Sequence, residues 1–99
     1  MSKPVALITG AARGIGLATA KRFMEDGWQV VGVDWDDAEL SKVSGSINDM
    51  HAIVGDVSKP QSVEAFMSEI SEKHGRLDAL VNNAGVADFG PIAETDFER

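Results

Sequence analysis

Three glycines stand close together near the start of the chain, at Gly10, Gly14 and Gly16. An apolar run comes before them and a helical pattern follows them, which predicts a strand, a tight turn and a helix. The N–H groups of a helix's first turn point out of its end and carry partial positive charge, which suits an anion. Glycine turns the chain sharply and lets a phosphate approach the backbone without meeting a Cβ atom. The cluster therefore predicts a binding site for a phosphate or pyrophosphate.

An acid, Asp34, ends the apolar run that follows. A carboxylate in this place accepts hydrogen bonds from both hydroxyls of an adenosine ribose and repels a 2′-phosphate. Arg13 acts in the opposite direction, because a cation beside the glycine turn can pair with a 2′-phosphate. Asp34 lies where that phosphate would have to go, and Trp35 rather than a basic residue follows it, so the sequence favours NAD over NADP. Trp35 itself is either a flank for the adenine ring or an exposed loop aromatic.

Polar residues also follow the third and fourth predicted strands. Asp56, with Val57 next to it, can reach an adenine amino group, because ligands of open α/β sheets lie across the carboxyl ends of the strands. A helix-capping acid is the structural alternative for Asp56. The stretch at residues 82–85 has two adjacent amides and two small residues, which can bond neighbouring backbone and leave room for a ribose. An ordinary Asn/Gly turn is the alternative there.

Alternating strands and helices are expected to position these residues. Apolar runs predict strands at 5–9, 29–34, 50–54 and 77–81, and helical patterns at 15–27, 37–43 and 60–74 lie between them. Ser58 is expected to cap the third helix, with Pro60 in its first turn, and Gly27 to end the first. Right-handed crossovers make this order an α/β fold with a doubly wound parallel sheet.

The two longer helices are each expected to bury one apolar face. The first has the stripe Ile15, Leu17, Ala18, Ala20, Phe23 and Met24, and the third has Val63, Phe66, Met67 and Ile70. Trp28 is expected to pack at a helix end. His51 and His74 are predicted to be too isolated to form a metal site or a base–nucleophile pair, and no metal ligand is assigned.

Length and charge limit the kinds of partner. The 99 residues are expected to form one domain, 1–99, with a net charge of −7, which argues against nucleic acid or an anionic membrane as a partner. The absence of cysteine excludes disulfides and thiolate metal sites. No stretch has the pattern of a signal peptide or a membrane span, so a cytoplasmic location is expected.

Together these motifs resemble the short-chain dehydrogenase/reductase family over residues 5–95 or so, and the glycine spacing Gly-x-x-x-Gly-x-Gly is that family's own form. The resemblance implies a Rossmann-like fold with strand order 3-2-1-4. It also implies NAD(H) or NADP(H) as cofactor, with hydride transfer between the nicotinamide and a small-molecule alcohol or carbonyl. A homo-oligomer is expected. The cofactor-binding residues would be Thr9, Gly10, Arg13, Gly14, Ile15, Gly16, Asp34, Trp35, Asp56, Val57, Asn82, Ala84 and Gly85.

The family's catalytic pair has no counterpart in this sequence. That pair is a Tyr-x-x-x-Lys motif, accompanied by a Ser and a further Asn, and the 99 residues contain no tyrosine. No catalytic residue is therefore assigned. A capping box at residues 95–98 would begin a further helix, so we expect the N-terminal part of a longer, truncated enzyme that is inactive alone and self-associates through its exposed fourth strand. The alternatives are a stand-alone nucleotide-binding or regulatory module and, with a poorer fit to residues 82–85, a methyltransferase.

Overall fold

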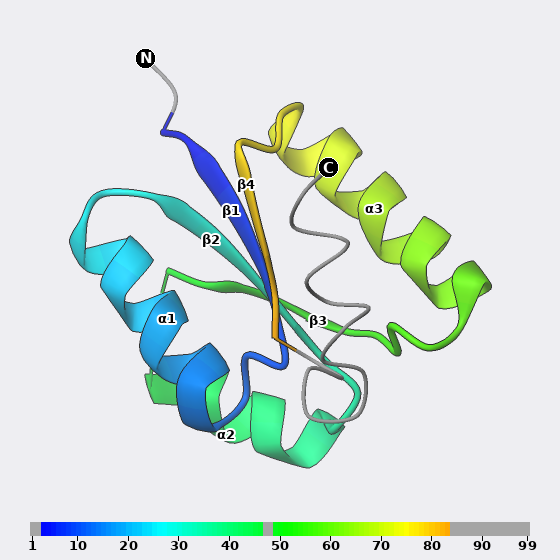
Figure 1. Ribbon diagram of the computed structural model, residues 1–99, viewed down its shortest axis with the longest axis horizontal. Coiled ribbons are helices and arrows are strands. Elements are labelled where there is room, and N and C mark those ends of the chain that lie inside the picture. Colours follow the sequence, from blue (N-terminus) through cyan, green and yellow to red (C-terminus); the bar gives the residue numbers. More distant parts are fainter. Residues whose placement is uncertain (1–2, 47–48, 84–99) are drawn as a thin grey trace.

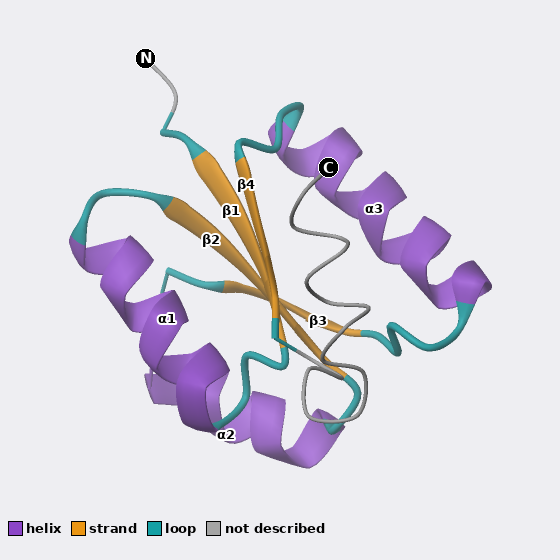
Figure 2. Ribbon diagram, viewed as in Figure 1, coloured by secondary structure: helices purple, strands orange, loops and turns teal. Residues whose placement is uncertain are grey.

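The computed structural model describes residues 3–46 and 49–83, where strands and helices alternate along the chain (Figures 1 and 2). The strands are β1 (Val5–Thr9), β2 (Gln29–Asp34), β3 (His51–Val54) and β4 (Ala79–Asn82), and the helices are α1 (Gly14–Glu25), α2 (Asp37–Ser46) and α3 (Pro60–His74). All strand pairs are parallel, and the sheet order is β3-β2-β1-β4. The predicted Rossmann-like sheet with strand order 3-2-1-4 is confirmed.

Helices cover both faces of the sheet, with α1 and α2 on one face and α3 on the other (Figures 1 and 2). Successive side chains of β1 point to opposite faces of the sheet, as the pleat of a strand requires. Ala6 and Ile8 belong to the cluster under α1 and α2, whereas Val5 and Leu7 belong to the cluster under α3. All five residues of β1 are buried, which explains its continuous apolar run.

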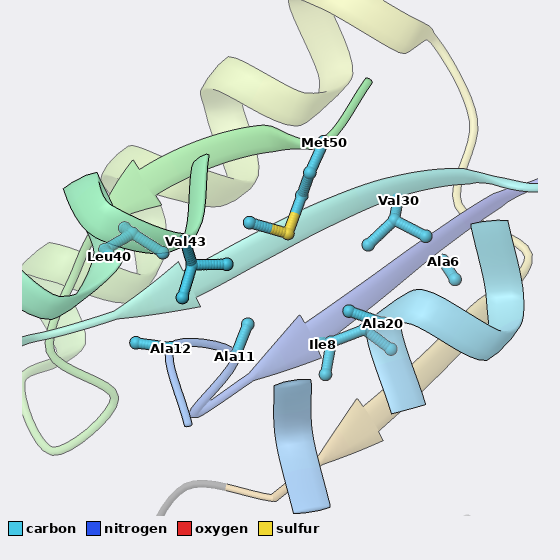
Figure 3. Packing of buried hydrophobic residues seen from close by; sticks show 9 residues of the cluster. All are labelled: Ala6, Ile8, Ala11, Ala12, Ala20, Val30, Leu40, Val43 and Met50. Atoms are coloured by element: carbon cyan, nitrogen blue, oxygen red, sulfur yellow. The ribbon is translucent and has the colours of Figure 1, made fainter. Parts of the chain in front are cut away.

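The cluster under α1 and α2 extends from the sheet to the glycine turn (Figure 3). Ala11 and Ala12 of the turn are 0% and 2% exposed. A Cβ on Gly32 of β2 would lie 2.6 Å from the sulfur of Met50 and 3.0 Å from the Cβ of Ala11, so glycine leaves the space that these side chains fill. The N–H of Ala11 also donates to the carbonyl of Val33 at 3.2 Å. Packing and hydrogen bonding thus hold the turn against the second strand.

Both long helices end as the sequence predicts. Gly27 follows the last residues of α1 with a φ of 91°, and Gly75 follows α3 with a φ of 72°, a conformation that glycine adopts without a steric penalty. The rings of Phe23 and Trp28 meet edge to face at the end of α1, with centroids 4.9 Å apart. The expected positions of Gly27 and Trp28 are therefore confirmed.

The predicted cap of α3 is wrong. Lys59, not Ser58, is the N-cap residue, and it makes no side-chain capping bond within the described part of the chain. The N–H and hydroxyl of Ser58 both donate to Oδ1 of Asp56, at 2.9 and 2.6 Å, so this side chain serves the preceding turn. Pro60 occupies the first turn of α3 as expected.

The apolar stripes of α1 and α3 are narrower than predicted. Gly16 and Ala20 are the buried residues of α1, and Phe66 and Ile70 those of α3. Because successive residues turn by about 100° around a helix, neighbours of these positions face away from the sheet. Ile15 is accordingly 75% exposed, Met67 is 37% exposed and Ala18 is exposed, so none of the three belongs to the core.

The strand and helix bounds differ from the predicted ones by up to three residues: α2 extends to Ser46 rather than to residue 43, and β4 begins at Ala79 rather than at residue 77. Within the described residues, every helix is too short or too polar to span a lipid bilayer. The capping box at residues 95–98 lies outside the described residues.

Candidate functional site

The predicted binding residues meet at one edge of the sheet, the edge formed by the carboxyl ends of the parallel strands. Thr9 of β1 pairs with Val33 of β2 and with Asn82 of β4, and Asp34 of β2 pairs with Val54 of β3. The glycine turn, Asp34, the loop after β3 and the end of β4 therefore lie along a single edge. In open α/β sheets this is the edge where ligands bind.

The glycines of the turn have distinct structural roles. Gly10 and Gly14 have φ values of 66° and 60°, which other residues adopt only with strain. A Cβ on Gly16 would overlap the carbonyl oxygen of Gly10, so the third glycine allows α1 to approach the end of β1 closely. A Cβ on Gly14 would meet no atom of the described residues within 4 Å. The turn is thus tightly packed at Gly16 and open at Gly14, as a phosphate-binding loop requires.

Among the described residues, no side chain competes for the N–H groups at the start of α1. The N-cap residue Arg13 has extended backbone and makes no side-chain capping bond in the described part of the chain. The first turn contains no acidic residue, and its Ile15 side chain projects into solvent. Since the first N–H groups of a helix lack intrahelical acceptors, this end of α1 is suited to a bound anion.

Asp34 joins the glycine turn to the loop after β2. Its side chain is 6% exposed, and its Oδ2 accepts the N–H of Ala12 at 3.0 Å, while its Oδ1 accepts the N–H of Asp36 at 3.0 Å. Each carboxylate oxygen has a second lone pair, so these bonds leave acceptor capacity for ligand hydroxyls. The predicted site acid is therefore also a structural acceptor for two backbone N–H groups.

Asp36 is a site residue that the sequence analysis missed. Its Oδ1 accepts the N–H of Glu39 at 3.1 Å, which makes it the N-cap of α2, and its Oδ2 lies 2.5 Å from Nη2 of Arg13. The N–H of Glu39 and the Arg13 guanidinium lower the pKa of the Asp36 carboxyl group. The signal in the sequence was an acid two positions beyond a strand-ending acid, at a helix start. Arg13 thus has an acidic partner within the protein.

The loop after β3 is organised around Asp56. Its Oδ1 accepts both bonds from Ser58, its N–H donates to the Ser62 hydroxyl at 2.8 Å, and its carbonyl accepts the N–H of Lys59 at 3.1 Å. The bonds from Ser58 lower the pKa of the Asp56 carboxyl group. Val57 packs against the cluster under α3. The structure thus gives Asp56 a turn-forming role at the ligand edge, next to a partly buried apolar side chain.

Asn82, the last residue of β4, and Asn83, which follows it, form hydrogen bonds with the end of β1 and with the glycine turn. The hydroxyl of Thr9 donates to Oδ1 of Asn82 at 3.0 Å, and Nδ2 of Asn83 donates to the carbonyl of Gly10 at 3.4 Å. These bonds tie the end of β4 to the end of β1 and to the glycine turn. Ala84 and Gly85 lie outside the described residues.

The prediction that the two histidines are isolated is wrong. Nδ1 of His51 lies 2.9 Å from Nε2 of His74, and Nε2 of His51 lies 2.8 Å from Oε2 of Glu69. The prediction failed because α3 runs back across the sheet, so that its last residue reaches the start of β3. Burial, and then the charges of His51 and Lys73, lower the pKa of His74.

This histidine pair lies at the amino end of β3, away from the ligand edge, and is not a metal chelate. The facing nitrogens are 2.9 Å apart and the ring centroids 5.1 Å apart, so the two nitrogens point at each other across a single hydrogen bond. Metal ligation would need both lone pairs to converge on a third point. Among residues 3–46 and 49–83, no group of three or more His, Cys, Asp or Glu side chains is arranged to hold a metal ion.

Residues 4–99 match the short chain dehydrogenase family, and the chain belongs to that family. It is 43% identical over 96 residues to a meso-2,3-butanediol dehydrogenase of Serratia marcescens, covering 95% of this chain. It is 38% identical over 103 residues to a galactitol 2-dehydrogenase of Agrobacterium fabrum, covering 100% of this chain. A 3-ketoacyl-(acyl-carrier-protein) reductase from Brucella melitensis, solved in complex with NADH, superimposes with a TM-score of 0.73 at 42% identity over 78% of this chain.

The chain spans only part of each relative: 38% and 40% of the two dehydrogenases and 32% of the reductase. The matches establish a family of oxidoreductases with a Rossmann fold that binds a nicotinamide dinucleotide. They exclude the methyltransferase alternative and lend no support to a stand-alone regulatory module.

Proposed function

We propose that this chain binds NAD(H) at the carboxyl edge of its sheet and forms the dinucleotide-binding part of an oxidoreductase. When bound, the cofactor would accept or supply the hydride exchanged with an alcohol or carbonyl carbon of a small molecule. The observation that carries the proposal is the glycine turn, which is open at Gly14 and leads into a helix N-terminus beside the Asp34 carboxylate.

The residues at this edge fit the parts of a dinucleotide. The pyrophosphate would lie against the turn at Gly14 and Ile15, where N–H groups and the absence of a Cβ favour an anion. Asp34 would accept the hydroxyls of the adenosine ribose with its remaining lone pairs. The adenine would lie between Trp35, which is 70% exposed, and the Asp56 loop.

The opposite part of the cofactor would lie over the end of β4. Asn82, Ala84 and Gly85 would contact the ribose next to the nicotinamide. Support for this placement comes from the bonds of Thr9 and Asn83, which hold the end of β4 against the turn, while the described residues leave the space at Gly14 open. Thr9 and Gly16 would shape the turn rather than touch the ligand, because one is 3% exposed and the other packs on Gly10.

NAD rather than NADP is the proposed cofactor. The carboxylate of Asp34 is nearly buried and held by two backbone bonds, so it cannot move far from an approaching 2′-phosphate. Two negative groups confined at hydrogen-bond distance repel each other strongly in such a site. The same carboxylate is well placed for the two neutral hydroxyls of an NAD ribose.

Proton transfer to or from the substrate would depend on residues other than these. The 99 residues contain no tyrosine, so we expect no turnover from the chain alone. The identity of the alcohol or carbonyl compound would likewise depend on other residues. A homo-oligomer, which rests on the resemblance to the family, and a cytoplasmic location, which rests on the sequence pattern alone, complete the proposal.

A matched pair of glycine variants tests the proposed site. Gly14 and Gly27 both have positive φ, and a Cβ on either meets no described atom within 4 Å, so Gly14→Ala and Gly27→Ala introduce similar strain. Each should lower the free energy of unfolding by about 1 kcal/mol. In calorimetric titrations, NADH should bind the wild-type chain and Gly27→Ala alike but bind Gly14→Ala at least about tenfold more weakly, a loss near 1.4 kcal/mol.

Equal NADH affinity in the two variants would contradict the placement of the pyrophosphate at Gly14. Absence of NADH binding by a wild-type chain that is folded by circular dichroism would contradict the proposed function as a whole.

A further inference from the structure

Arg13, the cation beside the glycine turn, is engaged by an acid from the loop after β2. Its Nη2 lies 2.5 Å from Oδ2 of Asp36, and the side chains are 59% and 24% exposed. We propose that Asp36 is a specificity-determining residue, which pairs with Arg13 and so keeps this cation from binding the 2′-phosphate of NADP. The inference rests on the proposed function, since it concerns the same dinucleotide site.

Asp36 is fixed in place by the backbone before Arg13 adds any bond. Its N–H donates to Oδ1 of Asp34 at 3.0 Å, its carbonyl accepts the N–H of Leu40 at 2.9 Å, and its Oδ1 accepts the N–H of Glu39 at 3.1 Å. Most exposed ion pairs are weak because two mobile side chains must be ordered at once. Here one of the two partners is already ordered as a helix cap, so the pair loses less conformational entropy when it forms.

The two acids act on a 2′-phosphate in different ways. Asp34 would repel the phosphate directly, because its carboxylate lies where the ribose hydroxyls are expected. Asp36 would remove an attraction, because Arg13 can form its charge-assisted bond with either the carboxylate or the phosphate. Specificity that combines repulsion with loss of an attractive partner is stronger than either alone. The bond from Asp36 N–H to Asp34 connects the two acids.

The substitution Asp36→Asn should remove the ion pair with Arg13 while keeping the helix cap of α2. Asparagine is as good an N-cap as aspartate, so its amide oxygen can keep the bond from Glu39 N–H. The amide nitrogen then faces Nη2 of Arg13, and two donors cannot bond to each other. The variant therefore keeps the start of α2 and releases Arg13.

Asp37→Asn is the matched control. It removes the same charge from the adjacent residue, whose Oδ1 accepts the Ser41 hydroxyl at 3.3 Å rather than an arginine. Dissociation constants for NADH and NADPH are measured for the wild type and both variants at one salt concentration. In Asp36→Asn the preference for NADH over NADPH should fall about fivefold, near the upper end of what the loss of one exposed ion pair produces. In Asp37→Asn the preference should change less than about twofold.

Two arginine variants complete the experiment. In Arg13→Gln the preference for NADH should stay within about twofold of wild type, because the paired arginine contributes nothing to NADPH binding. In the double variant Arg13→Gln/Asp36→Asn the fivefold gain for NADPH should disappear. The gain in Asp36→Asn should also shrink at high salt, which a change in the fold of α2 would not cause.

Several results would overturn the inference while leaving the proposed function intact: NADH binding with an unchanged preference in Asp36→Asn, equal effects of Asp36→Asn and Asp37→Asn, or a loss of NADPH binding in Arg13→Gln that exceeds the loss of NADH binding. Failure of the folded wild-type chain to bind either nucleotide would overturn both proposals.

Discussion

Asp34 should stabilise the fold even when no nucleotide is present, and Asp34→Asn tests this. The carboxylate is 6% exposed and accepts the N–H groups of Ala12 and Asp36, both at 3.0 Å. Asparagine has the same shape, so the substitution creates no cavity. It has only one acceptor oxygen, however, and its amide group would face one of the two N–H donors. One buried donor would therefore lose its partner.

The expected loss in the free energy of unfolding is about 2–3 kcal/mol. A buried donor left without an acceptor costs about 1–3 kcal/mol, and the remaining bond loses its charge-assisted character. For a chain of this size a loss of 2 kcal/mol corresponds to a decrease in melting temperature of about 8–16 °C. Asp26→Asn, at an exposed acid that pairs with Arg22 on the same helix, is the control and should change stability by less than about 0.5 kcal/mol.

The assay is urea unfolding without nucleotide, followed by circular dichroism. Equal stability of Asp34→Asn and Asp26→Asn would refute the reasoning, because it would mean that Asp34 has no structural role. A second measurement separates the structural role of Asp34 from its role in binding. Because a ligand stabilises the state that it binds, saturating NADH should raise the free energy of unfolding of the wild type more than that of Asp34→Asn.

The remaining predictions concern the histidine pair and the outer strand β4. The unfolded chain takes up a proton on His74 near its ordinary pKa of 6.5, whereas the folded chain does so only at lower pH. The free energy of unfolding should therefore fall as the pH drops below about 6.5. His74→Gln should flatten this pH dependence, and an unchanged pH profile in the variant would contradict the prediction. The neighbouring charges are those of His51, Glu69 and Lys73. Leu80 is 52% exposed on β4, an outer strand of the described sheet, so the 99-residue chain should self-associate. Leu80→Lys should weaken that association about tenfold or more in sedimentation experiments, since burying a leucine contributes about 1.5–3 kcal/mol. If the wild-type chain stays monomeric at high concentration, the prediction is wrong.

The features predictable from the sequence depend on local pattern. Continuous apolar runs identify β1 and β2 because both strands are covered on two faces, and the sheet order follows from right-handed crossovers. The position of Asp34 at the ligand edge follows from its place at the end of β2, since parallel strands end on the same side.

Contacts between side chains from different elements were not predictable in this way. The His51–His74 bond joins residues 23 positions apart, and the Arg13–Asp36 pair joins residues that are also 23 apart. Each depends on how far a helix or loop extends past a strand end, which residue types alone do not determine. The exposure of Ile15 shows the same limit, because an apolar residue next to the buried face of a helix looks like part of that face.

Nuclear magnetic resonance titration of the ¹⁵N-labelled chain with NADH would locate the bound dinucleotide on the sheet. We expect the amide signals of the glycine turn, of Asp34 to Asp36 and of the end of β4 to shift together and saturate, while those near His51 and His74 stay unchanged. Shifts confined to the histidine end of the sheet, or no saturable shifts in a folded chain, would contradict the proposal that the carboxyl edge binds the dinucleotide.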